Sequence, residues 1–208
     1  MPSSMIHIAV ANEVNKKLKR NSADFLIGSI APDISKEVGW SREKSHFIDN
    51  NDGIPNVDLF LNKYSSYLDD DFVLGYYVHL YTDYLWFKYF LTEIRGKDFI
   101  TKLDGTVIKY TGRMDLIYIY NDYTNLNIRL IDYYNLDLKI FYNDVPEFKN
   151  IIKEIPMDKI NVIVNKVGEV IENTKVHKDM VFNMDNVKLF IKTSVELILA
   201  NLKDIGVL

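Results

Sequence analysis

The sequence predicts an all-α protein, a single multi-helical domain over residues 1–208. Apolar residues recur at the spacing of a helix through most of the chain, which is the main signal for this fold class. Hydrophobic residues make up 48% of the chain and charged residues 26%, a balance that allows one sizeable core. We find no internal repeat, no low-complexity run and no obvious linker, so one domain is expected.

Helices are expected to follow one another closely in the N-terminal half. Their predicted ranges are 5–20, 23–30, 56–67 and 70–94. Pro32 stops the second of these helices, and Gly96 ends the last one. Residues 33–55 lie between two of the helices and are mixed and polar, so they predict a loop with at most one short turn of helix.

The C-terminal half changes character first and then returns to helices. A D-G turn at Asp104 and Gly105, between β-forming residues, predicts a small hairpin around 101–110. Helical spacing then returns, and a shorter helix is expected to begin at Pro146. The predicted ranges of the long helices in this half are 113–134, 157–174 and 184–204.

Charge and composition exclude several functions. The formal net charge is −4 and the isoelectric point is about 5.6, so there is no strong signal for nucleic-acid binding. The chain has no cysteine, which excludes disulfides and leaves His, Asp, Glu, Asn or backbone oxygen as metal ligands. The first residues lack the basic region of a signal peptide, so a cytoplasmic protein is expected.

A long apolar run over 72–91 contains three side chains that are costly in lipid, namely His79, Asp83 and Lys88. It therefore predicts a buried helix and not a membrane span. His79 and Asp83 are four residues apart and share one helix face, which is the spacing of two metal ligands. An isolated pair of this kind is more often a histidine oriented by a hydrogen bond.

Other ligand-type residues precede this pair. His7 and His46 also lie among apolar or aromatic residues, and Asp33 comes directly after a helix has ended. The candidate ligand set is Asp33, His46, His79 and Asp83. Two nitrogens and two carboxylates suit a metal that keeps room for water or substrate. Blander interpretations stay open here: a core histidine for His7, an exposed loop residue for His46 and an Asx turn for Asp33.

The order of these motifs resembles one known family. FLIGSIAPDIS precedes REKSHF, and GYYVHLYTDYLWF follows. Together with a histidine near the start, these motifs are similar to those of the zinc-dependent phospholipase C family, whose α-helical fold is shared by the fungal single-strand-specific nucleases. The resemblance covers about residues 5–95, and the rest of the chain matches only as further helices.

The resemblance implies a zinc-dependent phosphoric ester hydrolase. It makes the candidate set the ligands of one zinc, and it makes Asp83 a bridge to a second zinc that His7 also holds. Water or hydroxide between the metals would be the nucleophile. We therefore expect Asp33 and Asp83 to be the catalytic carboxylates, and zinc to be present as one or two ions, with manganese or iron also compatible.

The expected partner is a small-molecule or lipid phosphoester, with membrane contact at most peripheral, while the oligomeric state stays open. The chain also departs from the family. Secreted members bind metal through the amine of an N-terminal tryptophan, which this chain lacks, and His177 is the only later histidine. His177 is expected to be a solvated loop residue, so the third zinc site of the family is not expected. Asp122 could replace a lost ligand, but a polar helix face is the preferred interpretation.

Two other functions compete with this one. The first is a non-catalytic helical protein with a single structural or vestigial zinc site, which the loss of later ligands suggests. The second is a di-iron carboxylate bundle, because Glu43 and His46 have the E-x-x-H spacing used there. No second E-x-x-H occurs in the chain, which disfavours the iron centre.

Overall fold

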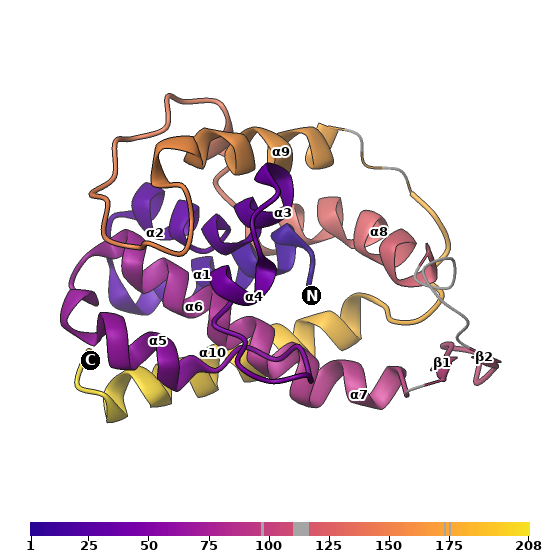
Figure 1. The fold of residues 1–208 in the computed structure, drawn as a ribbon. Coiled ribbons are helices and arrows are strands. Elements are labelled where there is room, and N and C mark those ends of the chain that lie inside the picture. The colour runs from indigo at the N-terminus through magenta and orange to yellow at the C-terminus, as the bar shows by residue number, and fades with distance from the viewer. Residues whose placement is uncertain (97, 110–116, 173, 175) are drawn as a thin grey trace.

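Helix α6 (Asp71–Leu85) runs through the middle of the molecule and is buried along most of its length (Figure 1). Asp70 caps its first turn, because the Asp70 side chain accepts hydrogen bonds from the backbone N–H groups of Phe72 and Val73. The helix continues through the π-helical turn η3 (Trp86–Phe90) into α7 (Leu91–Ile94). The long central helix expected over 70–94 is thus confirmed. The structure is a computed structural model, which describes residues 1–96, 98–109, 117–172, 174 and 176–208.

Helices from both ends of the chain surround α6. These are α1 (Ser4–Leu18), α2 (Ser22–Gly28), α5 (Val57–Tyr64) and α10 (Met184–Asp204). The closest approach is that of α2, because Gly28 and Gly75 lie where the two helices cross. A Cβ atom added to Gly75 would lie 2.1 Å from the carbonyl oxygen of Phe25. The backbones of α2 and α6 are therefore in contact, which holds the residues after α2 against the middle of α6.

The remaining helices cover this central group. Helix α8 (Ile117–Tyr134) packs on α1, and α9 (Ile160–Glu172) packs on α3 (Ile34–Val38) along one side of the molecule (Figure 1). Short 3-10 turns join them: η1 (Ala31–Asp33), η2 (Ser65–Tyr67), η5 (Lys139–Phe141) and η6 (Met157–Lys159). The described residues form one mostly helical domain around a single buried core, as expected.

The predicted hairpin is present. Strands β1 (Phe99–Thr101) and β2 (Val107–Lys109) pair antiparallel, with Ile100 opposite Ile108. Gly105 has a φ of 83° in the turn between them, a conformation that favours glycine. Figure 1 places this hairpin beyond α7, away from α3 and α4 (Arg42–Ser45). Residues 110 and 113–116, at the ends of the predicted hairpin and of the predicted helix 113–134, lie outside the described residues.

Two expectations about secondary structure are wrong. Residues 33–55 contain two short helices, α3 and α4, because Gly39 at a φ of 72° ends the first and the Ser41 side chain caps the second. The helix expected from Pro146 is absent, since residues 144–156 run without helical turns. Glu154 is buried in that segment and accepts hydrogen bonds from Lys63 and Tyr64, so side-chain contacts with α5 hold it in an irregular path. No helix in the described ranges is both long and apolar enough to span a bilayer.

Candidate metal centre

Five ligand-type side chains meet beside the middle of α6. His79 and Asp83 come from α6 itself and His7 from α1, while Asp33 ends η1 and His46 follows α4 directly. All five are buried, and only Asp33, at 7%, keeps appreciable exposure. Two triads of them lie close enough to hold a metal ion, and these triads share His79. The structure thus brings together the four members of the candidate ligand set and His7.

The donor atoms are spaced as ligands of a single ion are spaced. The Nε2 atom of His46 lies 3.3 Å from Nε2 of His79 and 3.4 Å from Oδ1 of Asp33. On the other side of His79, whose ring stacks on that of His7 at 3.8 Å, Nε2 of His7 lies 3.4 Å from Oδ1 of Asp83. Ligands about 2.0–2.1 Å from a tetrahedral zinc ion lie about 3.3–3.4 Å from one another. These distances therefore fit a metal site.

The hydrogen bond of His79 fixes the state of its ring. Nδ1 of His79 lies 2.8 Å from the carbonyl oxygen of Ser29, the residue that the α2–α6 crossing holds in place. A carbonyl oxygen only accepts, so Nδ1 carries the hydrogen and Nε2 presents a lone pair. Burial, and then the neighbouring His7, lower the pKa of His79 to about 3, so the ring is neutral. An imidazole oriented by a carbonyl in this way has the usual arrangement of a metal-ligating histidine.

A chain of hydroxyl groups holds the ring of His46 in place. The Ser35 hydroxyl donates to the carbonyl oxygen of Pro32, which can only accept. The Ser45 hydroxyl contacts Ser35 at 2.9 Å and Nδ1 of His46 at 2.8 Å. These contacts hold the ring so that Nε2 of His46 faces His79 and Asp33. Phe47, at a φ of 54°, turns the chain away directly after His46.

The centre contains buried polar atoms that lack a hydrogen-bond partner within the described residues. These atoms are Nδ1 and Nε2 of His7, Oδ1 of Asp33 and Oδ1 of Asp83. Buried polar atoms are normally satisfied, and unpaired ones call for a missing water or ion. Lone pairs of nitrogen and oxygen that face one another at these distances are the donor set of a divalent cation.

Both carboxylates are ionised. Burial alone would raise the pKa of Asp33, but interaction with His46 and with the charge on the other imidazoles outweighs it and lowers the pKa to about 2. Burial likewise acts to raise the pKa of Asp83, and interactions with His7 and His79 hold it well below its usual range. At neutral pH the centre therefore combines two negative carboxylates with the neutral imidazole of His79, a combination that attracts a cation.

Arg42 is a member of the site that the sequence analysis missed. Its Nη2 lies 3.0 Å from Oδ2 of Asp83, and its Nη1 donates to the carbonyl oxygen of Gly53 at 3.2 Å. Its guanidinium lies 5.4 Å from the ring centroid of Phe87. The sequence did contain one signal for Arg42. Arg42 precedes His46 by four residues, so a short helix there places both side chains on the same helix face.

The amino group of Met1 also lies near this centre. Burial lowers its pKa to about 6, while the charges of Asp83 and Asp33 act in the opposite direction. The Tyr123 hydroxyl donates to the Met1 carbonyl oxygen at 2.6 Å, which ties this residue to α8.

Other candidate residues lie apart from the centre. Asp122 is neither a ligand nor part of a polar helix face: its buried carboxylate accepts backbone hydrogen bonds from residues 180–182. His177 is exposed, as expected for a loop residue. Glu43 is exposed and accepts a hydrogen bond from Ser41 at 2.7 Å, so it does not join His46 in an iron-binding pair.

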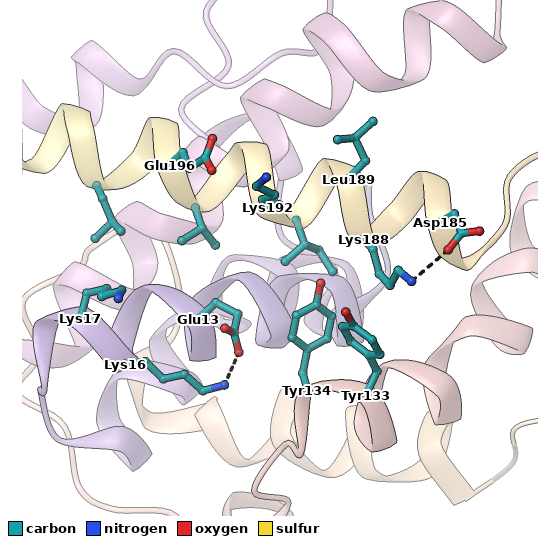
Figure 2. Close-up of a pocket in the computed structure, with 13 residues that line it drawn as sticks. Glu13, Lys16, Lys17, Tyr133, Tyr134, Asp185, Lys188, Leu189, Lys192 and Glu196 are labelled. Carbon is teal, nitrogen blue, oxygen red and sulfur yellow. Dashed lines mark hydrogen bonds and ion pairs between the residues drawn. The ribbon is translucent and has the colours of Figure 1, made fainter.

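A cavity of about 760 Å³ lies elsewhere, between α1, the end of α8 and α10 (Figure 2). Its charged lining is mixed, because Lys16 pairs with Glu13 at 2.5 Å and Lys188 with Asp185 at 2.9 Å. Figure 2 shows these pairs on opposite walls. None of the five ligand candidates lines this cavity. We therefore treat the buried centre, and not the cavity, as the candidate functional site.

Comparison with known proteins adds no relative to this description. No family model, no curated protein and no solved structure matches the chain.

Proposed function

We propose that the protein is a metal-dependent hydrolase of phosphate esters, which cleaves phosphodiesters in the manner of a phospholipase C. The observation that carries the proposal is the pair of Nε2 atoms of His46 and His79, 3.3 Å apart and flanked by ionised carboxylates. A buried donor set of nitrogen and oxygen suits zinc, and manganese or iron would accept the same donors. Phosphate esters come from the resemblance over residues 5–95.

The residues that would hold the metal are His7, Asp33, His46, His79 and Asp83. A divalent ion bound there would supply Lewis-acid activation of water and neutralise charge on phosphoryl oxygens. The protein's own contribution is preorganisation: Ser29 and Ser45 orient two of the imidazoles before any ligand arrives. Asp83 lies between His7 and His46, which orients its two oxygens toward different parts of the centre.

Asp33 is the group placed to orient an attacking water. It is the most exposed of the five side chains, so water and substrate would reach the centre beside it. Its carboxylate is ionised at neutral pH and can accept a hydrogen bond from an attacking water, which would orient that water. The proposed substrate is a small-molecule or lipid phosphoester met in the cytoplasm, with membrane contact at most peripheral.

The burial of the centre favours a second candidate function. His79 and Asp83 are fully buried, and His7 and His46 are each only 1% exposed. A metal in such a position can also serve to hold α1, α4 and α6 together. The alternative is therefore a non-catalytic helical protein with a single structural or vestigial zinc site.

Turnover separates the two functions. The purified protein is stripped with a chelator, reloaded with zinc and assayed with bis(p-nitrophenyl) phosphate and with phosphatidylcholine in mixed micelles. We expect hydrolysis that depends on zinc and is lost when His79→Ala and Asp83→Ala are combined, while His177→Ala keeps it. A melting temperature that depends on zinc, without turnover of either substrate, would favour the structural role.

A further inference from the structure

The guanidinium group of Arg42 bridges the buried centre and the solvent. The Asp83 carboxylate is fully buried, whereas the Arg42 side chain that pairs with it is 30% exposed. Contacts with Gly53 and with the ring of Phe87 hold the group in place from two further directions. Arg42 therefore presents a fixed positive charge at the edge of the centre.

The charge count gives this group a specific role. Asp33 and Asp83 contribute two negative charges, and Arg42 contributes one positive charge. One divalent ion would leave the centre with a net charge of about +1, and a second would raise it to about +3 in a buried space. Arg42 pairs with Oδ2 of Asp83, while Oδ1 faces His7, so Arg42 opposes a second ion through its positive charge and not by occupying that oxygen.

The guanidinium also has hydrogen-bonding capacity to spare. It carries five N–H groups, and within the described chain its hydrogen-bond partners are Asp83 and the Gly53 carbonyl oxygen. The Arg42 side chain is 30% exposed and that of Asp83 is fully buried, so Arg42 is the member of the pair that solvent reaches. A planar fork of donors fixed in this way matches the oxygens of a phosphoryl group.

We propose that Arg42 is the second cationic group of this centre, binding the phosphoryl oxygens of the substrate beside a single divalent ion. The proposal deepens the proposed function and rests on it for the identity of the substrate. Its geometric basis is the contact between Arg42 and Asp83 at 3.0 Å, together with the 30% exposure of the Arg42 side chain.

The test measures binding of inorganic phosphate to zinc-loaded protein by isothermal titration calorimetry. Wild type is compared with Arg42→Met, which removes the charge, and Arg42→Lys, which keeps it but loses the fork. Lys44→Met is the matched control, because Lys44 is an exposed cation on the same short helix as Arg42. The Lys44 ammonium group lies over the Trp40 ring. Metal content and melting temperature are measured for every variant.

We expect Arg42→Met to weaken phosphate binding about 10-fold or more, Arg42→Lys to weaken it less, and Lys44→Met to leave it unchanged. If Arg42→Met does not fold, the comparison of Arg42→Lys with wild type decides the matter. Phosphate binding that is equal in wild type and in the folded Arg42 variants overturns the proposal, as does a wild type that binds no phosphate. Phosphate binding that depends on Arg42, without turnover of a phosphoester, would instead leave Arg42 as an anion-binding residue and reject the hydrolase.

Discussion

The Nε2 atoms of His46 and His79 lie 3.3 Å apart, and the Ser29 carbonyl fixes His79 in the tautomer whose Nε2 presents a lone pair. A cation placed between these two nitrogens would accept that lone pair. Ser29, which orients His79, is itself held in place because α2 crosses α6 at two glycines just before it. The fold therefore places the ring of His79 before any ligand binds, as expected for a preorganised metal ligand.

Metal content is the first prediction. We expect one equivalent of zinc per chain by plasma mass spectrometry, because the charge of Arg42 opposes a second ion. His79→Ala and Asp83→Ala should each remove the metal, whereas His177→Ala, at an exposed position, should retain it. Two equivalents in wild type would favour the bridged arrangement that the family resemblance implies.

The same ion should stabilise the fold. Free zinc at 100 times its dissociation constant adds about 2.7 kcal/mol to the free energy of unfolding. Chelation should therefore lower the melting temperature of wild type by several degrees, as measured by circular dichroism, and should leave that of His79→Ala almost unchanged. Identical melting curves for wild type with zinc and with chelator would argue against any metal site at this place.

The metal-free protein should lose stability as the pH falls below about 6.5. His79 has a pKa of about 3 in the folded protein because of its burial, whereas an ordinary histidine in the unfolded chain titrates near pH 6.5. Between these values the unfolded state binds a proton that the folded state does not bind, so lowering the pH favours unfolding. The contribution of the neutral ring is complete above the unfolded pKa and is lost toward the folded one.

Urea denaturation of the stripped protein measures this effect. Between about pH 7.5 and about pH 5.5, the His79 contribution to the free energy of unfolding should fall by about 1.4 kcal/mol. His79→Gln, which keeps a polar side chain without a titrating ring, should show a correspondingly smaller fall. Equal falls in wild type and variant would mean that His79 takes up a proton in the folded state.

The N-terminal half was predictable because its signals are local. A fixed spacing placed His79 and Asp83 on one helix face, and a residue directly after a helix stop marked Asp33. Arg42 was not found, since its contact with Asp83 spans 41 residues and no spacing rule connects them. The irregular path after Pro146 was not found either, because it depends on the contact between Glu154 and Tyr64 across 90 residues.

The role of Asp122 also depends on contacts with residues far away in the sequence, and it can be tested by mutation. Oδ1 of its buried carboxylate accepts the N–H of Met180 at 2.8 Å, and Oδ2 accepts the N–H groups of Val181 and Phe182 at 2.6 and 3.1 Å. Asp122→Asn would direct an amide donor at one or more of these backbone donors. We expect a loss of about 1–3 kcal/mol in the free energy of unfolding, measured by urea denaturation.

Asp132→Asn is the control for this change, because Asp132 lies on the same helix and is exposed. Its stability should stay within about 0.5 kcal/mol of wild type. Zinc content should not change in either variant, since Asp122 is not among the clustered ligands. A large loss of zinc in Asp122→Asn, with stability intact, would revive the role of Asp122 as a substitute ligand.

Gly75→Ala tests how the fold positions the centre. The new methyl group would lie 2.1 Å from the Phe25 carbonyl oxygen, so α2 must move away from α6. Ser29 follows α2 directly and orients His79 through its carbonyl oxygen, so the same movement should disturb the imidazole. We expect a loss of about 1–3 kcal/mol in the free energy of unfolding. We also expect weaker zinc binding, measured by competition with a chelating dye.

Gly168→Ala is the matched control, because its methyl group would meet nothing closer than 3.9 Å inside α9, where alanine favours the helix. A Gly75→Ala variant that loses stability but binds zinc as tightly as wild type would separate the helix crossing from the assembly of the site.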